Sequence, residues 1–257
     1  MHSFFADGAL PPWELPREAA RRGLDAIALT NHGQVWAAKL GRWFSARIGG
    51  PTILVGQEIT APSYPLIAAG IEETVRWDQP AARAIEEVHR QGGVAIAAHP
   101  LAEYWPGFEG TLDALDGSER MHPLVFVDRE GARELLAFYE RGRSPNRPRA
   151  AVGSSDHHVG ADLGLCRTYV FARQDTPEAI LEALRAGRTV VYDRTGTPHG
   201  DPALLALLED RPLEGVGGPK PAGVAGICGW LGLAGLVVCG RPGPLSDSRP
   251  PVAPWAS

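Results

Sequence analysis

Cysteine is scarce in this chain of 257 residues, which contains only three, at positions 166, 228 and 239. So few and so scattered, they exclude a disulfide framework and a zinc site built from cysteine. Charged residues make up 21% of the chain and hydrophobic residues 44%. A chain of this length and composition can bury a full core and form a single α/β barrel of ordinary size.

Basic residues are not in excess, because 25 Lys and Arg stand against 30 Asp and Glu and give a net charge of -5. This balance argues against a surface that coats nucleic acid, and we predict no stable binding of duplex nucleic acid. Without a thiolate set, any metal in this chain must be held by imidazole and carboxylate groups.

Apolar runs that end in His, Asp or Glu recur along the chain. Residues 150–153 lead to Asp156 and His158, residues 23–30 to His32, residues 52–56 to Glu58 and residues 94–98 to His99, while His2 and Asp7 stand at the start. If the runs are parallel strands of one barrel, their carboxyl ends meet on one face and these side chains converge. Such a group would be poorly solvated and repulsive unless cations neutralise the carboxylates and occupy the imidazole lone pairs.

Helical and extended patterns alternate with short links, which favours an α/β fold with a parallel, closed or nearly closed sheet. Helices are predicted over residues 15–22, 35–48, 79–91, 132–141 and 177–185. Strands are predicted over residues 24–30, 53–55, 65–71, 94–98, 150–153, 167–171 and 189–192. No strand precedes His2, which is unusual for a barrel.

Five motifs, taken in order, resemble those of the PHP superfamily, the polymerase and histidinol phosphatase domain, over about residues 1 to 195. Residues 2–8 (HSFFADG) resemble the end of its His-x-His motif and a following Asp-Gly. The other four are Thr30-Asn31-His32, Gly56-Gln57-Glu58, Ala98-His99-Pro100 and Ser155-Asp156-His157-His158. A further stretch, Asp116 to Glu119 followed by His122, resembles a motif that lies between the last two.

The resemblance implies a distorted (β/α)7 TIM-like barrel over residues 1–200, which here lacks its first strand. It implies two or three divalent metal ions (Mn, Zn or Fe) and hydrolysis of phosphoesters by a hydroxide that bridges metals. Its ligand sets would be His2, Glu58 and Asp156 for one metal, Glu58, His99 and His122 for a second, and Asp7, His32 and His158 for a third. Glu58, Asp156 and His158 are the predicted catalytic residues, and the expected substrate is a phosphoester small molecule or a short oligonucleotide.

Two departures from the family pattern keep other readings open. The first histidine of His-x-His would precede Met1, as would the missing strand, so we hypothesise that the reading frame starts late. Asn31 replaces the aspartate of Thr-Asp-His, a change that keeps hydrogen-bonding capacity and removes a charge. The alternatives are a catalytically impaired metal-binding or regulatory module, and a carboxylic-ester or amide metallohydrolase on the same scaffold.

Several other candidate residues are given structural roles. His89 lies late in a helix, where a histidine interacts favourably with the helix dipole. His157 points away from its neighbours in an extended chain and is expected to support ligands rather than to bind metal. The aromatic residues Trp36, Trp43, Tyr104 and Trp105 are interpreted as core or pocket wall rather than as a base-stacking platform.

The C-terminal part of the chain is predicted to be separate. Residues 201–220 form a short helix and a linker, and residues 221–240 contain no charged residue, which matches the length of a bilayer crossing. The glycines at 223, 226, 229, 232 and 235 weaken a helix there, so the segment is either a membrane contact or a disordered or partly buried apolar tail. Residues 241–257 form a disordered tail. The chain is accordingly expected to be cytoplasmic or membrane-associated.

Overall fold

The computed structural model describes residues 1–142, 148–158, 162–192 and 197–208, which all belong to a compact unit, Met1–Val216. The predicted apolar segment 221–240 and tail 241–257 lie outside the described residues, and so do residues 209–220 of the predicted helix and linker. Within the described ranges, no helix has the length and apolar character that a membrane crossing requires. Membrane contact through residues 221–240 therefore stays a prediction.

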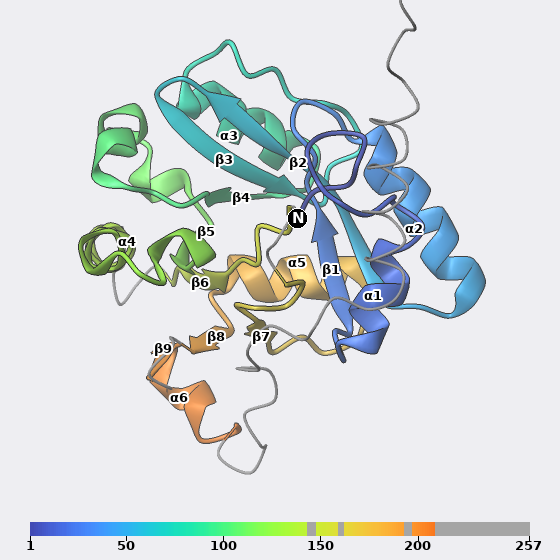
Figure 1. Cartoon of the computed structure of the whole chain (residues 1–257). Coiled ribbons are helices and arrows are strands. Elements are labelled where there is room, and N and C mark those ends of the chain that lie inside the picture. The colour runs from blue at the N-terminus through green and yellow to red at the C-terminus, as the bar shows by residue number, and fades with distance from the viewer. Residues whose placement is uncertain (143–147, 159–161, 193–196, 209–257) are drawn as a thin grey trace, which may run out of the picture. The chain divides into compact units, whose positions relative to one another are not determined.

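Six strands form the main sheet in the order β1-β2-β3-β4-β5-β6 (Figure 1). Their bounds are Ala26–Leu29 for β1, Thr52–Ala61 for β2, Tyr64–Ala69 for β3, Val94–Ala97 for β4, Gly117–Met121 for β5 and Ala150–Gly153 for β6. The pairs β1–β2, β4–β5 and β5–β6 are parallel, whereas β3 is antiparallel to both β2 and β4. All strands of this sheet except β3 therefore run in one direction.

The expectation of an all-parallel sheet is wrong at β3. Strand β2 continues to Ala61, and β3 begins at Tyr64, which pairs directly with Ala61. A connection of two residues allows only an antiparallel hairpin, because a parallel crossover needs a dozen residues or more. Both faces of β3 are largely buried, so its sequence lacks the polar alternation that would have indicated a hairpin.

The last two predicted strands exist, but they pair in a second sheet. This sheet has the order β7-β8-β9, with bounds Thr168–Val170, Thr189–Tyr192 and Pro198–Gly200, and both of its pairs are antiparallel. The side chain of Thr168 links β7 to the end of β6, since its Oγ1 accepts from Gly153 N (2.9 Å) and donates to Gly153 O (3.0 Å). Among the described residues the main sheet is thus a curled half-barrel. Strands β7 and β8 do not extend it as further parallel strands, so the predicted barrel is not closed by them.

The predicted helices are confirmed to within a few residues. The α-helices are α1 Leu15–Arg21, α2 Trp36–Ile48, α3 Ala81–Arg90, α4 Arg129–Arg141, α5 Pro177–Arg185 and α6 Pro202–Leu205. Helix α5 begins as its sequence indicates, because the Thr176 side chain accepts from Ala179 N and Pro177 occupies the first turn. Between β4 and β5, residues 102–108 form a 3-10 helix.

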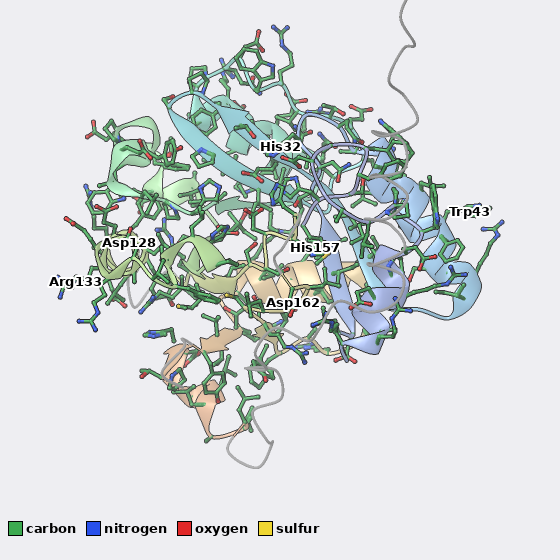
Figure 2. The ribbon with its side chains drawn as sticks, viewed as in Figure 1. His32, Trp43, Asp128, Arg133, His157 and Asp162 are labelled. Carbon is green, nitrogen blue, oxygen red and sulfur yellow. The ribbon has the colours of Figure 1, made fainter. Side chains whose placement is uncertain are left out.

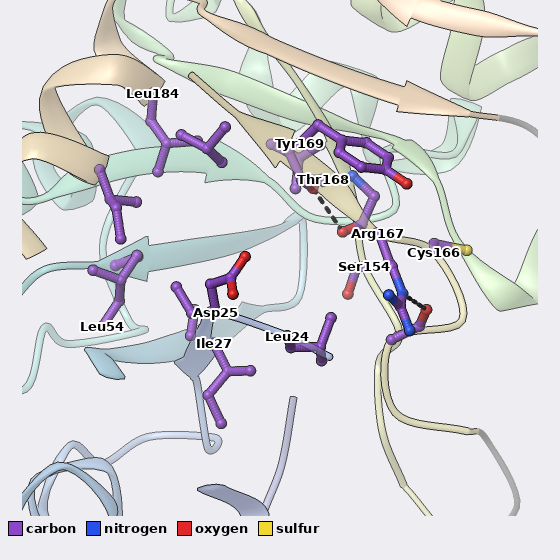
Figure 3. Close-up of a pocket in the computed structure, with 18 of the residues that line it drawn as sticks. Leu24, Asp25, Ile27, Leu54, Ser154, Cys166, Arg167, Thr168, Tyr169 and Leu184 are labelled. Atoms are coloured by element: carbon purple, nitrogen blue, oxygen red, sulfur yellow. Dashed lines mark hydrogen bonds between the residues drawn. The ribbon is translucent and has the colours of Figure 1, made fainter. Parts of the chain in front are cut away.

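One face of the main sheet borders a cavity of about 690 Å³. Figure 3 shows Ile27 and Leu54 on one side of it and Arg167, Thr168 and Tyr169 on the other. The centre of a closed barrel is filled by layers of side chains, so an open centre is consistent with a sheet that curls without closing.

Candidate metal centre

The amino terminus is held between the end of β1 and the segment that follows β6. The Met1 amino group donates to Thr30 Oγ1 (2.9 Å), and Thr30 N donates to Met1 O (2.9 Å). On the other side, His2 N donates to the backbone oxygen of His157 (3.3 Å). Figure 1 shows the amino terminus in the middle of the view, beside the tip of β1. These bonds place His2 among the carboxyl ends of the parallel strands.

The structure brings together all the side chains that the sequence nominated as metal ligands. His2 and Asp7 come from the first loop, His32 follows β1, Glu58 lies in β2, His99 follows β4, His122 follows β5, and Asp156 and His158 follow β6. The convergence expected from apolar runs ending in His, Asp or Glu is therefore found, at the strand ends where parallel sheets present such residues. Binding of metal by these residues stays a prediction.

Asp7 connects three imidazoles. Its Oδ1 lies 3.2 Å from His2 Nδ1, and its Oδ2 lies 3.1 Å from both His32 Nε2 and His158 Nε2. One ligand atom from each of these four residues can be chosen so that all lie within 4.8 Å of one another. A nitrogen-rich set with one carboxylate suits a first-row transition metal.

Glu58 and Asp156 form a second set with the other nitrogen of His2. His2 Nε2 lies 3.0 Å from Glu58 Oε2 and 3.4 Å from Asp156 Oδ1, again compatible with a shared ion. The remaining carboxylate oxygens face further imidazoles, since Glu58 Oε1 lies 3.3 Å from His99 Nε2 and Asp156 Oδ2 lies 3.3 Å from His122 Nε2. The two sets share His2, and His99 and His122 border the second.

The imidazoles are oriented by contacts to their other ring nitrogens. Thr60 Oγ1 lies 2.7 Å from His32 Nδ1, Leu124 N donates to His122 Nδ1 (3.1 Å), and His158 Nδ1 lies 2.8 Å from the backbone oxygen of Asp156. Each contact leaves Nε2 directed at a carboxylate of the cluster. The bond from His158 Nδ1 to the carbonyl oxygen is of the kind that fixes the tautomer and ring orientation of a metal-binding histidine, because the other ring nitrogen donates. The bond from Leu124 N makes His122 Nδ1 an acceptor, which places the proton of the neutral ring on Nε2, beside Asp156. Thr60 belongs to none of the sequence motifs, and its one signal in a single sequence is its place two residues after Glu58.

Glu119 is a second supporting residue, which the sequence indicated only as part of the weaker motif before His122. It is fully buried on β5, and its Oε2 accepts from His99 N (2.5 Å). His99 adopts a left-handed backbone with φ of 23°, as does Asp156 with φ of 39°. Among the described residues, these two are the non-glycine residues with positive φ. Backbone strain of this kind persists only where surrounding contacts impose it, often at functional sites.

The carboxylates of the cluster are held in the charged form. Burial acts to raise the pKa of Glu58, but the adjacent imidazoles of His2 and His99 outweigh it and hold that pKa well below its usual range. Burial also acts to raise the pKa of Asp156, and His122, His2 and His158 hold it far lower. Near neutral pH the cluster therefore presents negative charge toward its centre.

His99 shows the reciprocal effect. Burial acts to lower the pKa of its imidazole, but the neighbouring carboxylates of Glu58, Glu119 and Asp156 raise that pKa to about 9. In the absence of a cation, a proton on the imidazole thus balances part of the buried negative charge.

The buried nitrogens fit a bound cation. His2 Nδ1, His2 Nε2 and His122 Nε2 are fully buried and make no geometrically acceptable hydrogen bond within the described residues. Carboxylate oxygens nevertheless lie 3.2, 3.0 and 3.3 Å from them. Leaving a buried polar atom unsatisfied costs about 1–3 kcal/mol, and a cation between the unprotonated ring nitrogen of His2 and a facing carboxylate oxygen would satisfy both.

Asn31 and Gly8 shape the loop that carries His2 and Asp7. Ser3 N donates to Asn31 Oδ1 (2.7 Å), and Asn31 Nδ2 donates to Ser3 Oγ (2.7 Å), so the side chain of Asn31 fixes the loop. Its backbone oxygen accepts from Glu58 N (3.3 Å). At Gly8 an added Cβ would lie 2.1 Å from the backbone oxygen of His2. The Asp-Gly pair is thus explained sterically, because only glycine allows this close approach.

His89 and His157, which were predicted to have structural roles, make contacts that do not involve the ligand atoms of the cluster. His89 Nε2 lies 2.8 Å from Asp116 Oδ2 near the end of α3, outside the cluster. His157 is buried, and its backbone holds His2 as described above. Figure 2 shows His32 and His157 toward the middle of the molecule, whereas Trp43 extends outward from α2. Trp43 and Trp36 are about half exposed and so are not core residues, while Tyr104 and Trp105 do pack against the core. A place of Trp36 or Trp43 in a pocket wall stays a prediction.

Comparison with known proteins gives three findings. A family described as PHP-associated matches residues 145–189. The uncharacterized protein MJ1587 of Methanocaldococcus jannaschii is 29% identical over 102 residues, which cover 38% of this chain and 57% of that protein. A crystal structure of a two-domain protein from Bacteroides vulgatus, described as containing a predicted PHP-like metal-dependent phosphoesterase, is 24% identical with a TM-score of 0.58. The match covers 75% of this chain and 62% of that one, so this chain spans less than two thirds of the length of either relative.

Proposed function

We propose that this chain, whose matches support its assignment to the PHP superfamily, is a metal-dependent hydrolase of phosphoesters. The observation that carries the proposal is the pair of ligand sets, His2 with Asp7, His32 and His158, and His2 with Glu58 and Asp156. Both sets consist of imidazole and carboxylate, which suit two or three ions of Mn, Zn or Fe.

When bound, divalent cations at these residues would supply Lewis acidity toward a phosphoryl oxygen and activation of a water nucleophile near neutral pH. The residues of the chain have separate tasks. Glu58 and Asp156 provide fixed negative charge, because their pKa values are held low. Thr60 contacts His32 Nδ1 and so directs Nε2 of that ring toward Asp7, and the backbone oxygen of Asp156 does the same for His158. Asp7 and His32 lie on the exposed side of the cluster, where a substrate phosphate would approach.

The test is metal analysis of the purified chain combined with a substrate panel of phosphomonoesters, phosphodiesters, carboxylic esters and amides. We expect two or more ions of Mn, Zn or Fe per chain and hydrolysis of at least one phosphoester class that chelation abolishes and added metal restores. Hydrolysis confined to carboxylic esters or amides would favour the other hydrolase reading. Bound metal with no hydrolysis in the whole panel would favour the metal-binding or regulatory module.

A further inference from the structure

Four aromatic side chains form a continuous exposed surface, which we call the aromatic patch. Phe4, Phe5, Trp13 and Trp36 are 47, 40, 37 and 49% exposed. Ring centroids lie 4.2 Å apart for Phe4 and Phe5 and 4.5 Å apart for Phe5 and Trp36, while Trp13 lies 6.0 Å from Phe4. A contiguous apolar surface of this kind on a folded chain usually marks a binding site, because folding alone gains nothing from exposing it.

The aromatic patch belongs to the segments that carry the exposed members of the metal centre. Phe4 and Phe5 lie in the loop between His2 and Asp7, and Trp36 begins α2 four residues after His32. The loop is pinned, because Phe4 N donates to Leu10 O (2.9 Å) and both Ala6 N and Gly8 N donate to Ser3 O (2.9 and 3.1 Å). The rings are therefore held in place beside the cluster and need no loop movement to meet a ligand.

We propose that the aromatic patch binds a planar aromatic group, such as an aryl ring or a nucleobase, of the phosphoester whose phosphate lies at the metal centre. The inference rests on the proposed function and adds to it a substrate class. A ligand with its phosphate at Asp7 and His32 extends the remainder of its structure over the adjoining surface, and that surface is aromatic. Aromatic faces recognise planar π-systems by stacking, which tolerates differences in hydrogen-bonding groups.

The neighbouring exposed tryptophans are less suited to this task. The ring face of Trp43 is covered by the guanidinium of Arg47, whose Cζ lies 3.5 Å from the centroid. Trp77 is 55% exposed, lies in the segment between β3 and α3, and takes no part in the ring contacts that join the aromatic patch. Trp77 therefore serves as a matched control for an exposed tryptophan outside the patch.

The test measures the affinity of the Mn²⁺-loaded full chain for three phosphonates, which cannot be hydrolysed. Methylphosphonate probes the anion site alone, benzylphosphonate adds a planar ring, and cyclohexylmethylphosphonate adds a ring of equal carbon number that is not planar. By titration calorimetry we expect benzylphosphonate to bind about tenfold more tightly than cyclohexylmethylphosphonate. In Phe5→Leu and Trp36→Leu this ratio should fall to about one with methylphosphonate affinity unchanged, and in Trp77→Leu the ratio should persist.

The outcomes separate the two proposals. If methylphosphonate binds but the two ring-bearing phosphonates bind equally in the parent chain, or if the ratio survives in both patch variants, the aromatic patch does not recognise a planar group and the proposed function is untouched. If methylphosphonate fails to bind the metal-loaded chain, the anion site itself is refuted, and the patch proposal falls with it. Thermal unfolding of each variant confirms that the leucine replacements are folded.

Discussion

Replacing Glu58 by glutamine is the sharpest perturbation of the candidate metal centre. Glu58 is buried, and its two oxygens lie 3.0 Å from His2 Nε2 and 3.3 Å from His99 Nε2, on opposite sides of the carboxylate. Glutamine keeps the shape and one oxygen, but it removes the charge and turns an NH2 group toward one of the two imidazoles. Water cannot replace the lost oxygen at a site this buried.

The expected loss of metal affinity in Glu58→Gln exceeds the loss caused by removing a residue that only orients a ligand. Loss of a group that only orients a ligand weakens metal binding by about 10- to 100-fold, so loss of a charged oxygen that itself faces two ligands should reach at least the upper value. A 100-fold loss corresponds to about 2.7 kcal/mol of binding free energy. A second consequence is that the pKa of His99, about 9 in the parent chain, should fall, because Glu58 is the nearest of the carboxylates that raise it.

The assay is competition for Mn²⁺ or Zn²⁺ against a chelator of known affinity, with metal content measured after dialysis. Glu18→Gln is the matched control, because Glu18 makes ion pairs with Arg21 and Arg22 on α1 and lies outside the cluster. Equal metal content and equal resistance to chelator in the two variants would refute the role of Glu58. The imidazole titration of His99, followed by NMR in metal-free protein, checks the electrostatic part separately.

Three further predictions concern protons and the first loop. In metal-free protein the imidazole of His99 keeps its proton up to about pH 9. Because that proton must leave before the ring binds a cation, the affinity for Mn²⁺ should rise by about tenfold per pH unit between pH 6.5 and 9. Calorimetry in buffers of different ionisation enthalpy measures the released proton, and affinity independent of pH would contradict the prediction. Gly8→Ala should lower the free energy of unfolding by about 1–3 kcal/mol, because the added Cβ meets the backbone oxygen of His2. Urea titration measures this loss, and an unchanged midpoint of unfolding would mean that the loop relaxes around the added Cβ. Asn31→Ala should lower the free energy of unfolding by about 1–3 kcal/mol, because it leaves Ser3 N buried without its acceptor. Asn31→Asp keeps that acceptor and should lower the free energy of unfolding by less. Similar losses of thermal stability in the two variants would argue against this account.

The convergence of the candidate ligands was accessible to sequence reasoning because parallel strands impose a simple rule. Each of His32, Glu58, His99 and Asp156 follows or ends an apolar run, and the rule that such ends share one edge is independent of the detailed packing. Helix ends were accessible for the same kind of reason, since caps such as Thr176 act within four residues of chain.

Features that depend on long-range packing could not be predicted in this way. The direction of β3 is set by a short turn between Ala61 and Tyr64, but its uniformly apolar sequence is equally typical of a parallel strand. The contact of Thr60 with His32 and that of Glu119 with the His99 amide join residues that only the folded sheet makes neighbours. The exposure of Trp36 was likewise hidden, because tryptophan in a helix is more often buried.

The pinning of the amino terminus has a consequence for the order of folding. Strands β2, β3 and β4 are contiguous between residues 52 and 97, so their pairing closes short loops at small entropic cost. The bond from His2 N to His157 O instead joins positions near the start of the chain and beyond β6, and it contributes the residue that both ligand sets share. We expect the centre of the sheet to form in an early phase and the cluster to be completed when the two ends of this long loop meet. Recovery of metal affinity during refolding would then trail the recovery of backbone structure, and metal ions would stabilise the native state mainly by slowing its unfolding.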